Sequence, residues 1–445
     1  MAGLSQRRYA SELTADLLGK RATIAGWLQD VRNQGKIAFF FVRDRTGVVQ
    51  VVAKLNDVGA ERFARYAAVP RESVVALTGL VNASKAKAGG YEILLDAEGD
   101  LTVLNAAATP LPLGVVDKVA ADIETRLDNR FLDLRKPEIA AVFAVRSEIV
   151  GAGVEWFRRN GFAQIHTPRV IGSASEGGTD LFKVRYFERD AYLSQSPQLY
   201  KQMMMASGLD RVFEVATYFR AEKHNTPRHL NEITAFDAEI AFVESEEDVL
   251  RALEGLLGHI WQSVAQRCAQ ELATLGVTLP VPPARFLRIP YADAVERANA
   301  TGRLAQPVTP GEDLSAEAER VLGEELRKEG HDFYFLTRYP EAVRPFYTYV
   351  DDNGRDSRSF DLEYRGLEIT SGAQREHRPD KLAARIEHKG LNPADFEGYL
   401  KAFRYGMPPH GGFGMGIDRL VMVMLGLDNI REGVLFPRDR TRLAP

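Results

Sequence analysis

The sequence Gly-Phe-Gly-Met-Gly-Ile-Asp-Arg occupies residues 412–419, so that three alternate glycines precede Arg419, and an apolar stretch continues to residue 425. Glycine lets the backbone approach a ligand or another strand closely, and we therefore predict a Gly-rich turn that enters a helix at Ile417. A tight joint between a strand and a helix would show the same pattern. The glycines alone leave both structures open.

The sequence Phe-Arg-Ala-Glu at residues 219–222 is the second informative segment. It follows a strand-like stretch at 212–218, and a polar loop of 13 residues separates it from another strand-like stretch at 236–239. An arginine and a glutamate at the end of a strand usually form a solvated edge. An arginine that faces a ligand, however, binds phosphate oxygens through a planar, permanently charged fork.

In this order the two segments resemble motifs 2 and 3 of the class II aminoacyl-tRNA synthetases, and residues 138–168 resemble motif 1. The Walker A pattern of P-loop ATPases is missing from the chain, as are the His-x-Gly-His and Lys-Met-Ser-Lys-Ser motifs of the other synthetase class. The resemblance implies two catalytic arginines: Arg220 on the α-phosphate of ATP and Arg419 on the γ-phosphate. It also implies a homodimer through motif 1, and an ATP site composed of Arg220, Glu222, His229, Glu368, Gly416 and Arg419.

Two further segments are similar to the aspartyl members of this family in their archaeal form. They are Gln-Ser-Pro-Gln-Leu-Tyr-Lys-Gln at 195–202 and Gly-Leu-Glu-Ile-Thr-Ser-Gly-Ala-Gln-Arg at 366–375. A Ser-Pro pair is also a good helix start, which explains Ser196 but not Lys201. The similarity implies that Arg375 forks the side-chain carboxylate of aspartate while Lys201 neutralises it. The implied aspartate pocket consists of Ser196, Gln198, Lys201, Asp237, Ser371, Arg375 and Glu176. The last lies near the α-amino group, in a segment that resembles the mobile loop that closes over bound aspartate.

Acidic residues at 361, 363 and 368 indicate a candidate cation site. If residues 365 and 366 form a two-residue hairpin turn, Glu363 faces Glu368, and strand alternation places Asp361 on the same face. Crowded carboxylates are unfavourable unless a cation joins them, and Mg²⁺ prefers oxygen ligands. A solvent-exposed acidic face is the alternative. The resemblance implies Mg²⁺ as cofactor, ATP as co-substrate, and the metal ligands Asp361, Glu368 and Ser371.

The first hundred residues show the pattern of a small β-barrel. Strand-like stretches at 22–31, 37–43 and 48–53 precede a helical stretch at 57–68 and further strands at 73–81, 91–96 and 100–104. This order is typical of the OB fold, which binds single-stranded nucleic acid, although a barrel that binds proteins would look alike. Residues 1–105 carry 14 Lys and Arg against 11 Asp and Glu, only a weak excess for an RNA-facing domain.

We therefore predict an α+β protein, in which an N-terminal OB-fold β-barrel precedes a class II synthetase catalytic domain built around an antiparallel sheet. The expected domains are 1–105 for the barrel, 106–130 for a linker, and 131–445 for the catalytic domain with a peripheral insertion at about 276–330. Helices are expected at 137–160 and 245–275. By the resemblance, the barrel contacts the tRNA anticodon through Phe39, Gln50 and Glu92.

The chain departs from the family pattern at three positions. Ile233 stands where a phenylalanine usually stacks on adenine, so adenine would rest on an aliphatic surface. Relatives strictly specific for tRNA-Asp tend to have a tryptophan at the position of Gln29 and a lysine near Ala88. Their absence gives the hypothesis that the protein charges tRNA-Asn with aspartate as well as tRNA-Asp.

Three other functions are compatible with parts of this pattern. Lys201 argues against an asparaginyl-tRNA synthetase, because a neutral amide would gain little from that cation. The barrel with Phe39 and Gln50 argues against a tRNA-independent amide ligase built on the same core. An inactive RNA-binding paralogue should have lost one of the charged residues of motifs 2 and 3, and all of them are present.

The composition sets broad limits. A chain of 445 residues predicts two or three domains. It contains no apolar run of about 18 residues, and no apolar stretch follows Arg7 and Arg8, so we expect a cytoplasmic protein without a membrane span or secretory signal. The single cysteine, Cys268, is expected to be a small core residue rather than a nucleophile.

Overall fold

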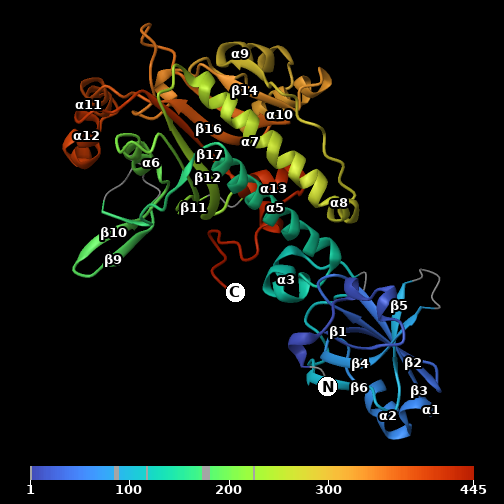
Figure 1. Cartoon of the computed structure of the whole chain (residues 1–445). Helices are drawn as coiled ribbons and strands as arrows, with labels where there is room; N and C mark the ends of the chain where they lie inside the picture. The colour runs from blue at the N-terminus through green and yellow to red at the C-terminus, as the bar shows by residue number, and fades with distance from the viewer. Residues whose placement is uncertain (1–2, 85–89, 117–118, 173–180, 224–225) are drawn as a thin grey trace. The chain divides into compact units, whose positions relative to one another are not determined.

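The computed structural model describes residues 3–84, 90–116, 119–172, 181–223 and 226–445 (Figure 1). The chain divides into two compact units, Met1–Asp122 and Ile123–Pro445. The boundary falls within the stretch predicted as a linker, and the second unit starts with α3 (Ile123–Asp128) and α4 (Arg130–Asp133). Within the described ranges, no helix is both long and apolar enough to span a membrane.

The first unit is a closed β-barrel. Its strands are β1 (Arg21–Asn33), β2 (Ile37–Arg43), β3 (Val48–Lys54), β4 (Val74–Ala83), β5 (Tyr91–Leu95) and β6 (Asp100–Asn105). Neighbouring strands follow the order β1-β2-β3-β5-β4-β6, and an antiparallel pairing of β1 with β4 closes the barrel. The predicted OB-type barrel is therefore confirmed. The helical stretch forms two helices, α1 (Leu55–Val58) and α2 (Ala60–Ala67), separated by Gly59 with a φ of 82°.

The second unit is built on an eight-stranded sheet. In spatial order its strands are β13 (Leu287–Pro290), β14 (Phe333–Thr337), β15 (Ser359–Tyr364), β16 (Glu368–Gln374), β17 (His410–Gly416), β12 (Glu232–Ala241), β11 (Arg211–Phe219) and β7 (Ala163–Gln164). The six central strands are antiparallel as predicted, but β13 and β7 run parallel to their neighbours, which makes the sheet mixed. A parallel pair needs a long crossover connection, and α9 (Tyr291–Ala300) and α10 (Ala316–Lys328) supply it between β13 and β14.

Two long helices, α5 (Pro137–Arg159) and α7 (Glu246–Arg267), lie side by side against the sheet (Figure 1) and share its main hydrophobic core. The α7 helix begins with the expected acidic turn, in which Ser245 accepts a hydrogen bond from the Glu247 amide and Asp248 completes a capping box. The helix predicted to continue to residue 275 is interrupted at Cys268, and α8 (Ala269–Leu275) follows. Cys268 is buried in the core, as predicted.

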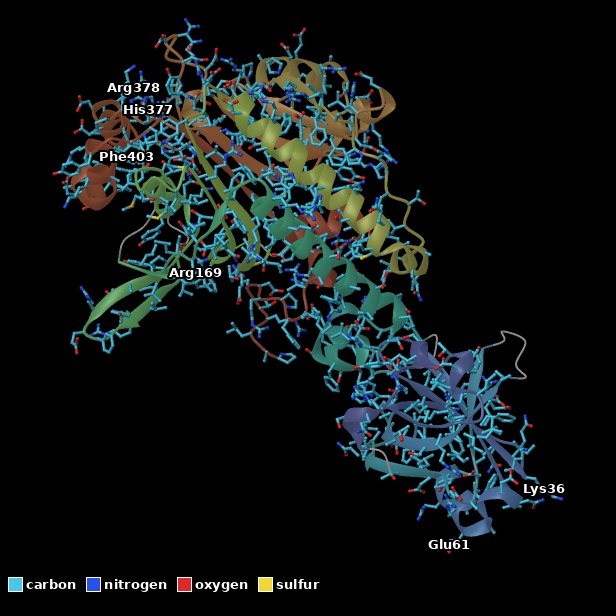
Figure 2. All side chains as sticks on the ribbon, in the orientation of Figure 1. Lys36, Glu61, Arg169, His377, Arg378 and Phe403 are labelled. Atoms are coloured by element: carbon cyan, nitrogen blue, oxygen red, sulfur yellow. The ribbon has the colours of Figure 1, made fainter. Side chains whose placement is uncertain are left out.

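The remaining elements surround this framework. They are α6 (Gln198–Met205), α11 (Pro379–His388), α12 (Glu397–Arg404), α13 (Ile417–Leu425), and a small sheet of β8 (Val170–Ile171), β10 (Arg189–Leu193) and β9 (Lys183–Tyr186). Arg169, labelled in Figure 2, lies directly before β8 and forms an ion pair with Glu214 of β11. The β13, α9 and α10 region, predicted as an insertion, has a hydrophobic core of its own.

The glycine-rich segment forms a strand, so the prediction of a turn was wrong and its alternative, a strand-to-helix joint, is correct. Strand β17 runs between β12 and β16 and passes directly into α13. A Cβ atom on Gly412 would lie 2.1 Å from Glu239 Oε2 and 2.2 Å from the carbonyl oxygen of Ala238. The glycine is needed here for space within the sheet rather than for a turn.

We expect Gly412→Ala to destabilise the protein by about 2 kcal/mol or more, because a backbone carbonyl and a buried carboxylate would both have to move. The matched control is Gly416→Ala in the same strand, where a new Cβ would meet only Arg419 Cβ at 3.8 Å and Cγ at 4.0 Å. Thermal unfolding should show a clear loss for the first variant and little change for the second. Equal melting temperatures would contradict this explanation of the glycine.

Candidate active site

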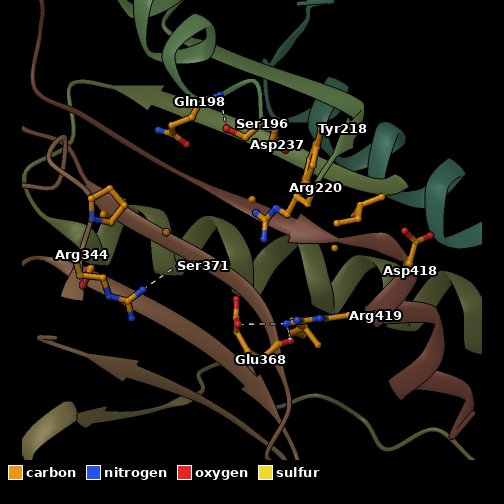
Figure 3. Close-up of a pocket in the computed structure, with 18 of the residues that line it drawn as sticks. Ser196, Gln198, Tyr218, Arg220, Asp237, Arg344, Glu368, Ser371, Asp418 and Arg419 are labelled. Atoms are coloured by element: carbon orange, nitrogen blue, oxygen red, sulfur yellow. Dashed lines mark hydrogen bonds and ion pairs between the residues drawn. The ribbon is translucent and has the colours of Figure 1, made fainter. Parts of the chain in front are cut away.

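A cavity of about 420 Å³ lies over the central strands β11, β12, β16 and β17 (Figure 3). Most of the residues predicted for the ATP and aspartate sites line it, although they come from segments far apart in the sequence. They are Ser196, Gln198, Arg220, Glu222, His229, Asp237, Glu368, Ser371, Arg375, Gly416 and Arg419. Lys201 and Asp361 are buried just behind this lining, and Glu176 lies outside the described residues.

The two predicted catalytic arginines point into the same part of the cavity (Figure 3). Arg220 follows directly after β11, with its Nη1 3.8 Å from Glu222 Oε1 and its guanidinium 5.7 Å from the centre of the Tyr218 ring. Arg419 belongs to the first turn of α13 and donates to the backbone oxygen of Glu368 at 3.0 Å and to Glu368 Oε2 at 3.3 Å. The sheet thus places two guanidinium groups where phosphate groups could bind between them.

Asn231 holds the loop after β11 in place through two hydrogen bonds. Its side-chain amide donates to the backbone oxygens of Arg220 at 2.7 Å and Glu222 at 3.1 Å. Ile233 lines the cavity beside this loop, and so does Tyr218, an aromatic residue that the sequence analysis did not select. Its position in the strand directly before Arg220 is the signal that could have identified it.

The other end of the cavity contains a buried network of opposite charges. Lys201 is only 2% exposed, and its Nζ donates to Asp237 Oδ1 at 2.9 Å and to the backbone oxygen of Phe413 at 2.8 Å. Arg375 donates through Nε to Glu239 Oε1 at 2.9 Å and through Nη2 to Glu239 Oε2 at 3.4 Å. Lys201 Nζ also lies 3.7 Å from Glu239 Oε2, which connects the two pairs.

Glu239 was not selected from the sequence, although strand alternation places it on the same face of β12 as Asp237. It is fully buried and has both predicted recognition cations as neighbours. His410 lies close by, where burial lowers its pKa to about 4. The imidazole is therefore neutral at physiological pH and adds no third positive charge to the network.

Two residues that line the cavity here each have a buried polar atom without a hydrogen-bond partner among the residues that the structure describes. The two atoms are Asp237 Oδ2, an acceptor, and Gln198 Nε2, a donor. An unsatisfied buried polar atom costs about 1–3 kcal/mol, so such atoms commonly mark a ligand site. An acceptor and a donor that line the same cavity match the ammonium and carboxylate groups of an amino acid.

The hairpin between β15 and β16 has the predicted turn. Arg365 and Gly366 have φ angles of 53° and 82°, and Glu363 is paired with Glu368. A bulge then shifts the register, so Asp361 is paired with Ser371. Asp361 forms an ion pair with Arg344, a residue that the sequence analysis did not select. No cluster of three or more His, Cys, Asp or Glu side chains that could hold a metal ion occurs within the described ranges.

The two carboxylates and one hydroxyl of the predicted metal site nevertheless suit a hard divalent cation. Burial, together with the charge of Asp361, raises the pKa of Glu368 above its ordinary value. Burial also raises the pKa of Glu363, which lies next to Glu319 and Glu368. Burial is the larger cause in both groups, and the neighbouring carboxylates add negative charge that a bound Mg²⁺ would neutralise.

Glu319 of α10 provides a test of this excess charge. Burial, with Glu368 and Asp361 nearby, raises its pKa to about 8. Between its unfolded pKa and this value, the folded protein holds a proton that the unfolded chain has lost. The stability of the metal-free protein should therefore fall as the pH rises from about 5 to 8, by at most about 1.4 kcal/mol per pH unit for this group.

Glu319→Gln should remove this contribution. In the presence of a chelator, we expect the variant to have a higher melting temperature than the unmodified protein at pH 8 and a similar one at pH 5. A thermal unfolding series across this range measures the difference. A shift of equal size at both pH values would mean that the proton on Glu319 is not involved.

In the first unit, the three predicted anticodon residues lie on adjacent strands. Phe39 and Phe41 are half-buried and alternate with the buried Ala38 and Phe40. Gln50 is paired with Phe41, and its Nε2 donates to Glu92 Oε2 at 2.7 Å. The guanidinium of Arg32 lies 4.8 Å from the Phe41 ring centre. This outer face therefore combines aromatic, amide and cationic groups, as single-stranded RNA recognition requires.

Comparison with known proteins agrees with both units. Residues 122–440 match the family described as tRNA synthetases class II (D, K and N), and residues 22–99 match the OB-fold nucleic acid binding domain. The aspartate–tRNA(Asp) ligase of Thermococcus kodakarensis is 51% identical over 98% of this chain and 99% of the relative. The aspartate–tRNA(Asp/Asn) ligase of Methanocaldococcus jannaschii is 48% identical over 98% of both chains.

A solved structure is similar over the whole length as well. The asparaginyl-tRNA synthetase of Pyrococcus horikoshii, complexed with asparaginyl-adenylate, has a TM-score of 0.90 and 34% identity, and the match covers 99% of each chain. The fold, the order of the motifs and the full-length relatives agree. The chain belongs to the class II tRNA synthetases of the D, K and N group and, within that group, to the aspartate–tRNA ligase family.

Proposed function

We propose that the protein activates L-aspartate with ATP and transfers the aspartyl group to the 3′ end of tRNA-Asp. The observation that carries this proposal is the buried Lys201 and Arg375 pair at one end of a cavity whose other end holds Arg220 and Arg419. The unsatisfied Asp237 Oδ2 and Gln198 Nε2 support an amino acid between them. Two cations around one carboxylate favour aspartate over its neutral amide.

The proposed reaction has two steps. An α-carboxylate oxygen of aspartate attacks the α-phosphorus of ATP in line, the bond to the pyrophosphate oxygen breaks, and aspartyl-adenylate forms. A ribose hydroxyl of the terminal tRNA nucleotide then attacks the acyl carbon, and AMP leaves. Neither step requires a nucleophile from the protein. Arg220 and Arg419 position the phosphates and stabilise the charge that develops on them.

In this scheme Asp361, Glu368 and Ser371 would hold Mg²⁺, which neutralises charge on the phosphate oxygens when bound. Glu222 would orient the adenine amino group, and His229, held by Thr226 Oγ1 at 2.6 Å, would lie beside the nucleotide. Ile233 and Tyr218 would form the surface for the adenine ring. The adenine ring would thus rest on a neighbouring aromatic ring as well as on the aliphatic side chain expected from the sequence.

Amino-acid-dependent ATP–pyrophosphate exchange, measured separately with all twenty amino acids, tests the proposal. Aspartate alone should support exchange. Asparagine-dependent exchange would favour the asparaginyl alternative, in line with the asparaginyl-tRNA synthetase among the similar structures. Exchange that stays efficient while tRNA is never charged would favour the amide ligase.

We further propose that both tRNA-Asp and tRNA-Asn are aspartylated. Relatives of nearly equal similarity are named for tRNA(Asp) alone and for tRNA(Asp/Asn). Gln29 accepts a hydrogen bond from Arg43 Nη1 at 3.4 Å, beside the buried Arg43–Glu72 ion pair of the barrel, whereas Ala88 lies outside the described residues.

Aminoacylation with the two purified tRNAs decides this point. We expect aspartate on both, and we expect Gln29→Trp to reduce charging of tRNA-Asn by about tenfold while tRNA-Asp serves as internal control. Failure of the unmodified protein to charge tRNA-Asn would disprove the broader specificity.

Finally, we propose a homodimer through α5 and the segment that follows it. In this segment β7 is the outermost strand of the large sheet, and it is paired with β11 on one side. An exposed strand edge is a ready site for pairing between chains. Light scattering should give about twice the mass of 49.5 kDa calculated for one chain.

A further inference from the structure

We propose that Arg344 is an internal counter-ion of the metal site, which holds Asp361 and Ser371 while no divalent cation is bound and competes with that cation for them. This inference rests on the proposed function, because it takes Asp361 and Ser371 as metal ligands. It adds a residue that the motifs do not include, and it predicts the sign of that residue's effect on metal affinity.

The contacts of Arg344 coincide with two of the three predicted ligands. Its Nη1 lies 3.2 Å from Asp361 Oδ1, its Nη2 donates to Asp361 Oδ2, and Nη1 also donates to Ser371 Oγ at 3.4 Å. Figure 3 shows this guanidinium turned toward Ser371, with Glu368 and Arg419 beyond it. A planar fork on a carboxylate is a strong, charge-assisted arrangement, so the carboxylate oxygens are already occupied by a cation.

The position of Arg344 relative to the cavity makes the competition direct. Arg344 lines the cavity, whereas Asp361 is not part of the lining and is only 7% exposed. The guanidinium lies 3.6 Å from the centre of the Tyr339 ring, and its buried Nε has no hydrogen-bond partner among the described residues. A cation that binds both oxygens of Asp361 would therefore have to displace the Arg344 guanidinium from them.

Electrostatics predicts the direction of the effect. Two cations that share one carboxylate repel each other, and this repulsion is strong at the short distance that separates them. A neutral side chain at position 344 leaves Asp361 and Glu368 without this counter-ion. The metal-free protein should then be less stable, and a divalent cation should bind more tightly.

The test is Mn²⁺ binding, followed by the paramagnetic resonance signal of the free ion, with the full chain and without ATP. We expect Arg344→Gln to bind Mn²⁺ at least about tenfold more tightly than the unmodified protein. Arg344→Lys keeps the positive charge but loses the planar fork. The Mn²⁺ affinity of this variant should therefore fall between that of the unmodified protein and that of Arg344→Gln. The matched control is Arg365→Gln, which removes an arginine that pairs with Asp332 at the hairpin turn and does not line the cavity. Its affinity should be unchanged.

Equal or weaker Mn²⁺ binding by Arg344→Gln would overturn the proposal, because it would show that Arg344 supports the metal ligands rather than competing for them. If this variant does not fold, Arg344→Lys decides the question in the same way. Absence of Mn²⁺ binding in every variant would also overturn it. Aspartate-dependent ATP–pyrophosphate exchange by the unmodified protein is measured in parallel. A failure of the proposed function appears in this exchange assay, whereas a failure of the present proposal appears in the Mn²⁺ affinities of the variants.

Discussion

Arg220→Ala is expected to abolish ATP–pyrophosphate exchange, with a loss of at least about a thousandfold in rate. Arg220 directly follows a central strand, and Asn231 fixes its backbone oxygen at 2.7 Å. The side chain, in contrast, reaches into the cavity beside Glu222 and Tyr218. Removal of the guanidinium should therefore eliminate phosphate positioning without disturbing the sheet.

The matched control for this prediction is Arg211→Ala, at the opposite end of the same strand. Arg211 is exposed and donates to the backbone oxygen of Asn160 at 3.3 Å, remote from the lining of the cavity. Both variants should unfold at similar temperatures, and only Arg220→Ala should lose exchange. Retained exchange in Arg220→Ala would refute the role of this arginine in binding the α-phosphate.

Lys201→Ala is expected to reduce kcat/KM for aspartate by about a thousandfold or more, while ATP binding changes little. The buried network adds a second effect that the sequence did not show. Without Lys201, the carboxylates of Asp237 and Glu239 lie close together with only Arg375 to balance them. An uncompensated buried charge typically costs about 3–5 kcal/mol, so this variant should also be clearly destabilised.

A double variant separates the two effects. Lys201→Met with Asp237→Asn removes both members of the ion pair and keeps the net charge of the network unchanged. Thermal stability should recover substantially, whereas aspartate use should stay lost. Equal losses of aspartate and ATP use in Lys201→Ala, at temperatures where the variant is folded, would count against the pocket assignment.

The sequence was most informative where a pattern reflects local geometry. Alternation and turn residues correctly predicted the pairing of Glu363 with Glu368, because a two-residue hairpin determines its own register. The bulge that brings Asp361 opposite Ser371 has no such local signal. The glycine run was misjudged as a turn because its neighbours, β12 and β16, are contributed by distant parts of the chain.

The candidate site shows the same limit. The motif arginines and the aspartate-pocket residues were found through family resemblance, and the structure places most of them around one cavity. Arg344 was missed because its contact with Asp361 joins two segments without periodicity or a motif. Glu239 could have been found from alternation alone, but only the folded structure shows that it joins Lys201 and Arg375.

The absence of a side chain at Gly412 has a consequence for changing the amino-acid preference of such an enzyme. The space left by this glycine is filled by the carboxylate of Glu239, which in turn holds both cations of the pocket. Gly412, which belongs to the segment that resembles the nucleotide motif, thus determines how much space is available for Glu239 and therefore for the two cations that Glu239 contacts. Redesign for a different substrate would have to alter two neighbouring strands together, since a bulkier group on either one displaces the other.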